Sequence, residues 1–445
     1  MHTLAKLKSG ELHGIKRLQI VEELTEFPQQ IIALKDSLEI LDLSNNQLSS
    51  LPDNFCELVN LRIVFLSQNQ FTELPQVLSQ CPKLEMVGFK ANRISYIAAD
   101  ALPITTKWLI LTDNQLSQLP HNFGQLTQLR KLALAGNELT SLPDSMKNCV
   151  NLELIRLSAN QLTELPDWLF TLPKLSWLAF AGNSFNHVAE CLNNSVPTIN
   201  PQHLQLEAQI GQGASGVIYR ATWQHKPQNL QHLPNELAVK IFKGAITSDG
   251  YPADELDCCL TVGQHANLIP AIGQINQQQT HPHQLGLIME LIPAGYQNLG
   301  LPPSLITCTR DTFLAETEFA LQQIVSIGLQ IANTMAHMHH KNVSHGDVYA
   351  HNIMINQQDN VLFGDFGAAS NLVHLPIHQQ ANMQKVEVRA LGCLLDDLLN
   401  LVNPNDARLE QRAVAQLTEI IAKCFAPKVD ERPNFAEVAA LLASI

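Results

Sequence analysis

The chain has 445 residues, of which 45% are hydrophobic and 16% charged, and a formal net charge of −13 at pH 7. These proportions are ordinary for a globular protein, and the acidic balance argues against a general binder of nucleic acid or of acidic membranes. The nine cysteines are scattered and form no CxxC pair, which is typical of a reducing compartment and argues against a structural zinc site.

The first segment, MHTLAKLKSGELHG, has no apolar core of the kind that marks a secretory signal. The chain also has no run of about 18 apolar residues that would suggest a transmembrane helix. We therefore expect a cytoplasmic protein with no membrane span.

The next feature is a long repeat. Asparagines recur every 23 residues, once every 22, inside the pattern L-x-x-L-x-L-x-x-N-x-L-x-x-L-P: Asn46, Asn69, Asn92, Asn114, Asn137, Asn160 and Asn183. A fixed period of this length indicates a solenoid. We expect the Leu positions, with Cys81 and Cys149, to fill a shared core. The Asn side chains should bond backbone groups left unpaired at the turns, forming a ladder. The pattern resembles the leucine-rich repeat, and residues 12–34 resemble a worn first repeat with Glu23 in place of Asn.

One position of each expected strand points to solvent on the concave face and is mostly apolar. Contiguous exposed apolar side chains usually mark a contact site, so we expect this face to bind a protein substrate or regulator, or else the second half of this chain itself. The alternative is that these side chains only lean on their neighbours along the sheet. The residues in question are Ile40, Ile63, Met86, Trp108, Leu154 and Trp177.

The periodicity ends after Phe185, in residues rich in Asn, Pro and Ser. This predicts a solenoid over residues 1–190, a linker over 191–202 and a second domain over 203–445. In the second domain, strand-like segments come first, up to LGLIMELI after a Gln- and His-rich hairpin at 274–284. Helical patterns follow after Thr317. Such an order suits two lobes with a cleft between them, an N-lobe over 203–292 and a C-lobe over 293–445.

Five motifs follow one another in this second domain. The first, with Gly211, Gly213 and Gly216, is weak alone because dinucleotide-binding folds also use G-x-G-x-x-G. Here, however, it lies between two expected strands and does not open a helix. The remaining motifs are Ala238-Val239-Lys240, His345-Gly346-Asp347 with Asn352, Asp365-Phe366-Gly367 and Glu431-Arg432-Pro433. In this order and spacing they resemble the protein kinase family.

The whole chain thus resembles leucine-rich-repeat protein kinases of bacterial type. The resemblance implies an α/β leucine-rich-repeat solenoid followed by an α+β bilobal kinase-like domain, with ATP and Mg²⁺ as cofactors. The residues implied in nucleotide binding are Gly211, Gly213, Gly216, Ile218, Ala238, Lys240, the gatekeeper Met289 and the hinge residues Glu290 and Ile292.

The catalytic roles are also implied by the resemblance. Lys240 would hold the α- and β-phosphates and would itself be held by an acidic helix residue. Glu255 is our choice for that residue, with Asp254 and Asp257 as alternatives. Asp347 would orient the acceptor hydroxyl and take its proton. The hard oxygen ligands suited to Mg²⁺ would come from Asn352 and Asp365.

The sequence departs from the family pattern at three points. The Arg that usually precedes the catalytic Asp is Gly346. The stretch 368–386 has a single hydroxyl, Ser370, and no APE triplet before a helix expected from residue 386. We therefore expect no switch by phosphorylation of this loop, and we expect a Ser370→Ala variant to behave like wild type.

The third departure concerns the cations near the catalytic Asp. Tyr349 stands at the position of the Lys typical of serine/threonine kinases, and His351 stands where tyrosine kinases carry Arg. Protonated His351 is therefore a candidate for stabilising transition-state charge.

We expect an ATP-dependent protein kinase, specific for Ser or Thr, whose solenoid recruits or regulates. Two other classes of function remain as alternatives. A pseudokinase scaffold is disfavoured by the complete Lys240, Asp347, Asn352 and Asp365 set. A small-molecule kinase is favoured by the missing APE segment, which normally forms part of the peptide platform.

Overall fold

The computed structural model describes residues 2–186, 196–213, 215–243, 247, 249–276 and 285–445. The chain divides into two compact units. One comprises Met1–Leu175 with Asn183–Phe185, and the other comprises Ser176–Gly182 with Asn186–Ile445. Residues 191–195 of the predicted linker and 277–284 of the predicted hairpin lie outside the described residues.

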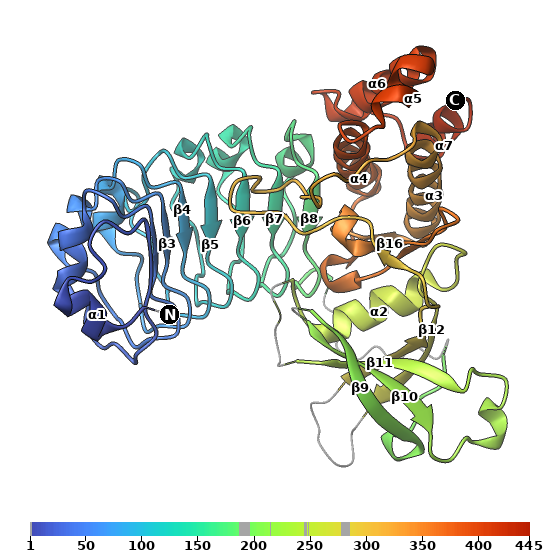
Figure 1. Ribbon diagram of the computed structural model, residues 1–445, viewed down its shortest axis with the longest axis horizontal. Coiled ribbons are helices and arrows are strands. Elements are labelled where there is room, and N and C mark those ends of the chain that lie inside the picture. The colour runs from blue at the N-terminus through green and yellow to red at the C-terminus, as the bar shows by residue number, and fades with distance from the viewer. Residues whose placement is uncertain (1, 187–195, 214, 244–246, 248, 277–284) are drawn as a thin grey trace. The chain divides into compact units, whose positions relative to one another are not determined.

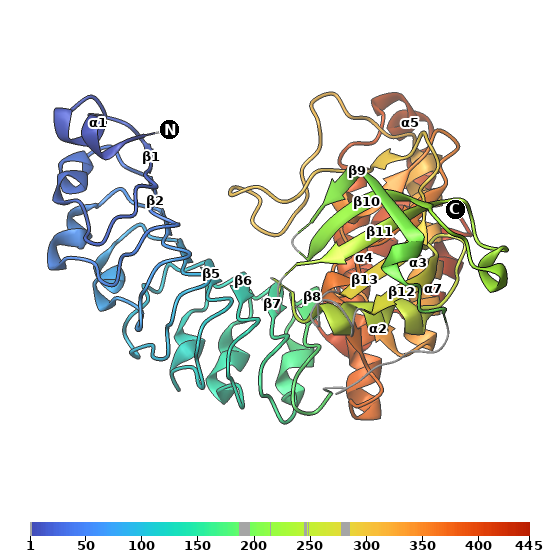
Figure 2. The ribbon, with the colours of Figure 1, turned by 90° about the horizontal axis from the view of Figure 1, so that it is seen from below.

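The first unit is a solenoid that begins with helix α1 (Leu4–Ser9) and continues as successive repeats (Figure 1). Each repeat contributes a three-residue strand, and consecutive strands pair in parallel without slippage, so that Ile40 lies opposite Ile63 and Ile63 opposite Met86. The strands are β1 (Arg17–Gln19), β2 (Ile40–Asp42), β3 (Ile63–Phe65), β4 (Met86–Gly88), β5 (Trp108–Ile110), β6 (Lys131–Ala133) and β7 (Leu154–Arg156). In Figure 2 they form a row along one side of the unit.

On the opposite side the chain returns through short 3-10 helices, several of which begin directly after the Pro of the repeat. Proline suits this position because the residue before each helix is extended, as at Pro52 with a φ of −74° and a ψ of 155°, and the fixed φ of proline fits that conformation. These helices are η1 (Gln29–Leu34), η2 (Asp53–Glu57), η3 (Gln76–Gln80), η4 (Phe123–Gln125), η5 (Asp144–Asn148) and η6 (Asp167–Thr171).

The predicted asparagine ladder is confirmed. The side-chain amide of Asn69 donates to the carbonyls of Leu43 and Leu66 at 3.0 and 3.1 Å, and its oxygen accepts the N–H of Leu48 at 2.9 Å. The same scheme recurs at the other repeats, which satisfies buried backbone groups where each strand turns. Cys81 and Cys149 are fully buried, and burial raises the pKa of their thiols to about 12 and about 11.

The apolar column expected on the strands is only partly accessible. Met86, Leu154 and Trp177 are 5%, 3% and 1% exposed, so the expectation that all six side chains face solvent is wrong for these three. Ile40, Ile63 and Trp108 are half-buried. Trp177 is covered by Tyr349 of its own unit, with ring centroids 4.6 Å apart, so its burial is a contact with residues outside the repeats.

The second unit begins with a five-stranded antiparallel sheet in the order β12-β13-β11-β10-β9. Its strands are β9 (Leu204–Gln212), β10 (Gly216–Trp223), β11 (Glu236–Phe242), β12 (Ala271–Asn276) and β13 (Leu285–Glu290). A buried cluster that includes Val239, Ile272 and Ile288 forms the core beneath it. Ile199, which was predicted to be linker, is 1% exposed in the same cluster.

The rest of the second unit is mainly helical, with α3 packed against α4 and α7 (Figure 1). Its helices are α2 (Pro252–Val262), α3 (Leu321–His340), α4 (Ile377–Leu399), α5 (Pro404–Leu409), α6 (Gln411–Cys424) and α7 (Phe435–Leu442). Short strands complete it: β14 (Gln297–Asn298), β15 (Val343–Ser344), β16 (Ile353–Ile355), β17 (Val361–Phe363) and β18 (Ser370–Asn371). Strand β8 (Trp177–Ala179) also groups with this unit, although it is the strand of the last repeat.

These elements confirm the predicted fold class, a repeat solenoid followed by a sheet-first, helix-later domain. One boundary was wrong, because α4 begins at Ile377 and not at residue 386. No helix among the described residues combines the length and the apolar character needed to cross a lipid bilayer.

Candidate active site

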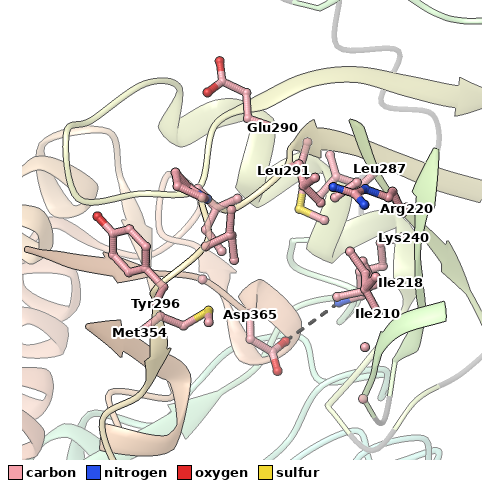
Figure 3. A pocket seen from close by; sticks show the side chains of 18 of the residues that line it. Ile210, Ile218, Arg220, Lys240, Leu287, Glu290, Leu291, Tyr296, Met354 and Asp365 are labelled. Atoms are coloured by element: carbon pink, nitrogen blue, oxygen red, sulfur yellow. Dashed lines mark ion pairs between the residues drawn. The ribbon is translucent and has the colours of Figure 1, made fainter. Parts of the chain in front are cut away.

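A cavity of about 1180 Å³ lies between the antiparallel sheet and the short strands and loops of the second unit (Figure 3). All but two of the predicted site residues line it; the two that do not are Gly216 and Asp347. The lining residues that were predicted from the sequence are Gly211, Gly213, Ile218, Ala238, Lys240, Glu255, Met289, Glu290, Ile292, Asn352 and Asp365.

Lys240 is the charged centre of the sheet side of this cavity. It lies on β11 directly opposite Ile218 of β10, and only 7% of its surface is exposed. Its ammonium group forms an ion pair with Glu255. It also lies 3.8 Å from Asp365 Oδ1, the pair marked by the dashed line in Figure 3. Burial lowers the pKa of Lys240, but the two carboxylates outweigh that effect and raise it above its ordinary value. The lysine is therefore held as a cation in the cavity.

Of the three carboxylates that the sequence offered as partner of Lys240, the structure pairs Glu255. This residue lies in the first turn of α2 and is 4% exposed. Asp254, one residue earlier, points elsewhere and lies against Gly182. Burial, and then the charge of Asp257, raise the pKa of Asp254 to about 7.

The glycine motif joins β9 to β10, as the sequence predicted. Gly213 donates its N–H to the carbonyl of Gly216 at 3.0 Å, which closes the hairpin. A Cβ added at Gly213 would meet no atom within 4 Å, so its backbone faces open space. Gly216 has a different reason to be glycine, because a Cβ there would lie 2.7 Å from the carbonyl oxygen of Ile241. Its role is close packing between strands, which explains why it does not line the cavity.

The far wall of the cavity follows the end of β13. Met289 and Glu290 end that strand and Ile292 follows it, and all three line the cavity. The N–H of Glu290 already donates to the carbonyl of Pro270 at 3.0 Å. Several further residues line the cavity here without belonging to any motif, among them Arg220, Leu287, Tyr296 and Met354 (Figure 3). Alternation gives a signal for Arg220, which stands two residues after Ile218 on β10 and so shares its face.

Asp347 lies in the loop that follows β15. The amide group of Asn352 donates to its carboxylate at 3.1 Å and to its carbonyl at 3.0 Å, which fixes its orientation. Glu387, fully buried on α4, holds the start of the same loop by accepting the N–H groups of His345 and Gly346 at 2.9 and 2.6 Å. The loop is therefore preorganised by residues outside it.

Asn352 and Asp365 bring oxygen atoms to the same cavity. The amide nitrogen of Asn352 is engaged with Asp347, which leaves its carbonyl oxygen as the side chain's acceptor. Asp365 is held at a φ of 58° directly before the 3-10 turn η10 (Phe366–Ala368), and about half of its side chain is exposed at the cavity. Two hard oxygen donors from separate loops are the kind of set that binds Mg²⁺ while leaving positions for water and phosphate. The residues present fit such an ion.

His351 also lines the cavity, and a second carboxylate orients it. Its Nδ1 lies 2.7 Å from Oδ1 of Asp311, a residue that is 8% exposed and also accepts the N–H of Ala350. Burial lowers the pKa of His351, but the hydrogen bond and charge of Asp311 outweigh that effect and raise it. No sequence signal points to Asp311, which lies in an irregular segment without a motif.

The departures from the expected pattern have structural counterparts. Gly346 has a φ of 72°, and a Cβ there would lie 2.4 Å from the carbonyl oxygen of Ala368. Ser370 is fully buried, so its hydroxyl is not at the surface. Tyr349, in the position of the expected Lys, is 5% exposed and its ring stacks on that of Trp177, with centroids 4.6 Å apart.

Comparison with known proteins gives the same two-part division. Residues 204–393 match the family model described as protein tyrosine and serine/threonine kinase, and residues 36–94 and 128–185 match the leucine rich repeat model. Tyrosine-protein kinase Fer of Mus musculus is 24% identical over 280 residues, covering 54% of this chain and 31% of that protein. Serine/threonine-protein kinase Nek10 of Homo sapiens is 23% identical over 285 residues, covering 53% of this chain and 22% of that protein.

A solved leucine-rich-repeat protein of Leptospira interrogans is also similar, with 30% identity and a TM-score of 0.38 over 40% of this chain and 46% of that one. The chain spans about a third or less of the length of the two curated kinases, 31% of Fer and 22% of Nek10.

Proposed function

Because the chain carries leucine-rich repeats followed by a protein kinase domain, we propose that it is an ATP- and Mg²⁺-dependent protein kinase that phosphorylates serine or threonine side chains. The observation that carries this proposal is the set of charges at one cavity. A buried lysine is paired with Glu255 and lies 3.8 Å from Asp365, which lines that cavity together with Asn352.

In this proposal each residue acts through the contacts described above. Lys240, kept cationic by its carboxylate partners, binds the phosphates of ATP. Asn352 and Asp365 hold the metal, which when bound neutralises charge on the phosphates. Asp347, oriented by Asn352, accepts the proton of the acceptor hydroxyl. The apolar side chains of Ile218, Ala238 and Met354 enclose the adenine.

Tyrosine is a second candidate acceptor, and one observation favours it. His351 stands at the position where tyrosine kinases carry an Arg, and it lines the cavity. The raised pKa of His351 favours its charged form. Tyr349, by contrast, is buried against Trp177 and leaves no cation at the position typical of serine/threonine kinases.

The test is phosphoryl transfer from labelled MgATP by the full chain, with protein and peptide acceptors that offer Ser, Thr or Tyr. Asp347→Asn should lower turnover by about a hundredfold or more, the scale of a lost general base, while MgATP binding persists. Asp365→Asn should lose Mg²⁺-dependent binding as well. The matched control is Asp430→Asn, which changes an exposed carboxylate in the 3-10 helix Val429–Glu431 and should behave like wild type.

The outcomes separate the alternatives. Binding of MgATP without transfer to any acceptor would support a scaffold without catalysis. Transfer to small alcohols but not to protein would support a small-molecule kinase. Labelled phosphotyrosine without phosphoserine or phosphothreonine would replace the first acceptor class with the second.

We also propose that the solenoid recruits a protein partner or substrate, since leucine-rich repeats commonly mediate protein contacts. Of the column expected from the sequence, the half-buried Ile40, Ile63 and Trp108 remain as contact residues. The double variant Ile63→Ser/Trp108→Ser should raise the KM for a protein acceptor and leave that for a short peptide unchanged. Equal effects on both acceptors, or none, would overturn this role.

A further inference from the structure

Strand β8 and its flanking residues, Ser176–Gly182, belong to the second unit and contact the loops of its site. Trp177 is 1% exposed, and its ring lies nearly parallel to that of Tyr349, at an interplanar angle of 6°. Its indole Nε1–H donates to the carbonyl of Val348 at 3.1 Å. Val348 and Tyr349 directly follow Asp347, so Trp177 holds both the backbone and a side chain of the catalytic loop.

The same segment reaches the residues after the Asp-Phe-Gly motif. The N–H of Phe180 donates to the hydroxyl of Ser370 at 3.0 Å. Ser370 lies on β18, which pairs with β15 at the start of the catalytic loop. A Cβ at Gly346 would lie 3.0 Å from the carbonyl oxygen of Leu178. Three neighbouring residues of the segment therefore contact two loops of the site.

The end of the segment lies against the start of α2. Gly182 has a φ of 72°, and a Cβ there would lie 2.5 Å from the ring of Tyr251 and 2.6 Å from the carboxylate of Asp254. Only glycine suits both this backbone conformation and this approach. Since Glu255 follows Asp254 directly, the segment abuts the turn of helix that supplies the partner of Lys240.

We propose that Ser176–Gly182 is a built-in positioning element, which holds the catalytic loop, the residues after the Asp-Phe-Gly motif and the start of α2 in their catalytic arrangement. Trp177 is its central positioning residue, because it touches the two residues that directly follow Asp347 and does not line the nucleotide cavity. This proposal rests on the proposed kinase function. It makes the final repeat strand, and not a phosphate on the loop, the element that assembles the site.

The experiment uses the full chain and the variants Trp177→Ala and Trp177→Phe. Trp168→Ala is the matched control, because Trp168 is half-buried on η6 of the first unit. Three quantities are measured: backbone hydrogen exchange in residues 343–352, kcat with MgATP, and the Kd of MgATP. Exchange reports loop order even when no acceptor is turned over.

Loss of the ring pair and of the hydrogen bond in Trp177→Ala should speed exchange in the loop and lower kcat by about tenfold, with the Kd of MgATP changed by less than about twofold. Trp177→Phe keeps a ring and loses the indole donor, so its effect should be smaller, about threefold. Trp168→Ala should change none of these quantities. If Trp177→Ala does not fold, the Phe variant decides.

Wild-type exchange and kcat in both Trp177 variants, or the same changes in Trp168→Ala, would overturn the positioning role. A wild-type chain that binds MgATP but shows no transfer would instead refute the proposed function. In that case, faster exchange confined to residues 343–352 in the Trp177 variants still supports positioning of the loop, and unchanged exchange refutes it.

Discussion

Ser370 allows a sharp test of how the residues after the Asp-Phe-Gly motif are held. Its hydroxyl accepts the Phe180 N–H at 3.0 Å, its carbonyl accepts the Ser344 hydroxyl at 3.2 Å, and the residue is fully buried. Ser370→Ala keeps the carbonyl contact and loses the hydroxyl contact, so we expect it to be less stable than wild type, whereas the sequence alone predicts a silent variant. Removing the acceptor of a buried N–H costs about 1–3 kcal/mol. In a domain of this size each kcal/mol lowers Tm by about 2–4 °C, so we expect a fall of roughly 2–12 °C.

Ser370→Asp tests the phosphorylation question directly. A phosphate would be mimicked by a carboxylate, but an unpaired charge in a fully buried site is costly, so we expect loss of folding and no activation. The assay is thermal unfolding of the full chain, following the transition that MgATP raises, together with turnover before and after phosphatase treatment. The exposed Ser444 gives matched Ala and Asp controls, which should change stability by less than about 0.5 kcal/mol.

The reasoning fails if Ser370→Asp turns over faster than wild type. It also fails if phosphatase treatment slows the wild-type enzyme, because either result would mean that the loop carries an activating phosphate. A Ser370→Ala variant as stable as wild type would show that the hydrogen bond to Phe180 contributes nothing net.

Three further predictions follow from single residues. Since the pKa of His351 is raised, its cation should persist to higher pH and be lost as pH rises through that pKa, so turnover should fall over that range, whereas His351→Arg should show a flat profile; an equal fall in both would exclude His351 as its source. Restoring the usual Arg with Gly346→Arg should destabilise the fold by at least about 1–2 kcal/mol, because the left-handed backbone and the Ala368 carbonyl exclude a side chain; a more stable or more active variant would contradict this. Asn114→Ala should lower the stability of the solenoid by about 1–3 kcal/mol, measured by chemical unfolding, and an unchanged midpoint would show that the ladder bonds contribute nothing net.

The sequence was sufficient wherever the signal is local or periodic. The 23-residue period predicted the strand positions and the ladder at Asn69, since each repeat meets a copy of itself. The glycine motif was placed between two strands by the pattern on either side of it. By contrast, the choice of Glu255 over Asp254 depends on which way one helical turn faces, and neighbouring carboxylates look equivalent in sequence.

Other parts of the site needed long-range information. Trp177 occupies the same position in its repeat as Ile40 and Trp108, so nothing in the pattern distinguishes a buried positioning residue from a solvent-facing one. The start of α4 at Ile377 did leave a signal, because Pro376 immediately precedes it. The apolar run at residue 386 predicts a later start, since the residues between Ile377 and that run are largely polar.

The departures of the catalytic loop from the protein kinase pattern lie around one segment. Gly346 stands where a side chain would meet Leu178 as well as Ala368, Tyr349 stacks on Trp177, and Ser370 accepts the N–H of Phe180. Read separately, these are a missing Arg, a missing Lys and a loop with a single hydroxyl. Together they are the surface on which Ser176–Gly182 packs. The positions that lack groups able to bind a loop phosphate are therefore the positions where Ser176–Gly182 packs.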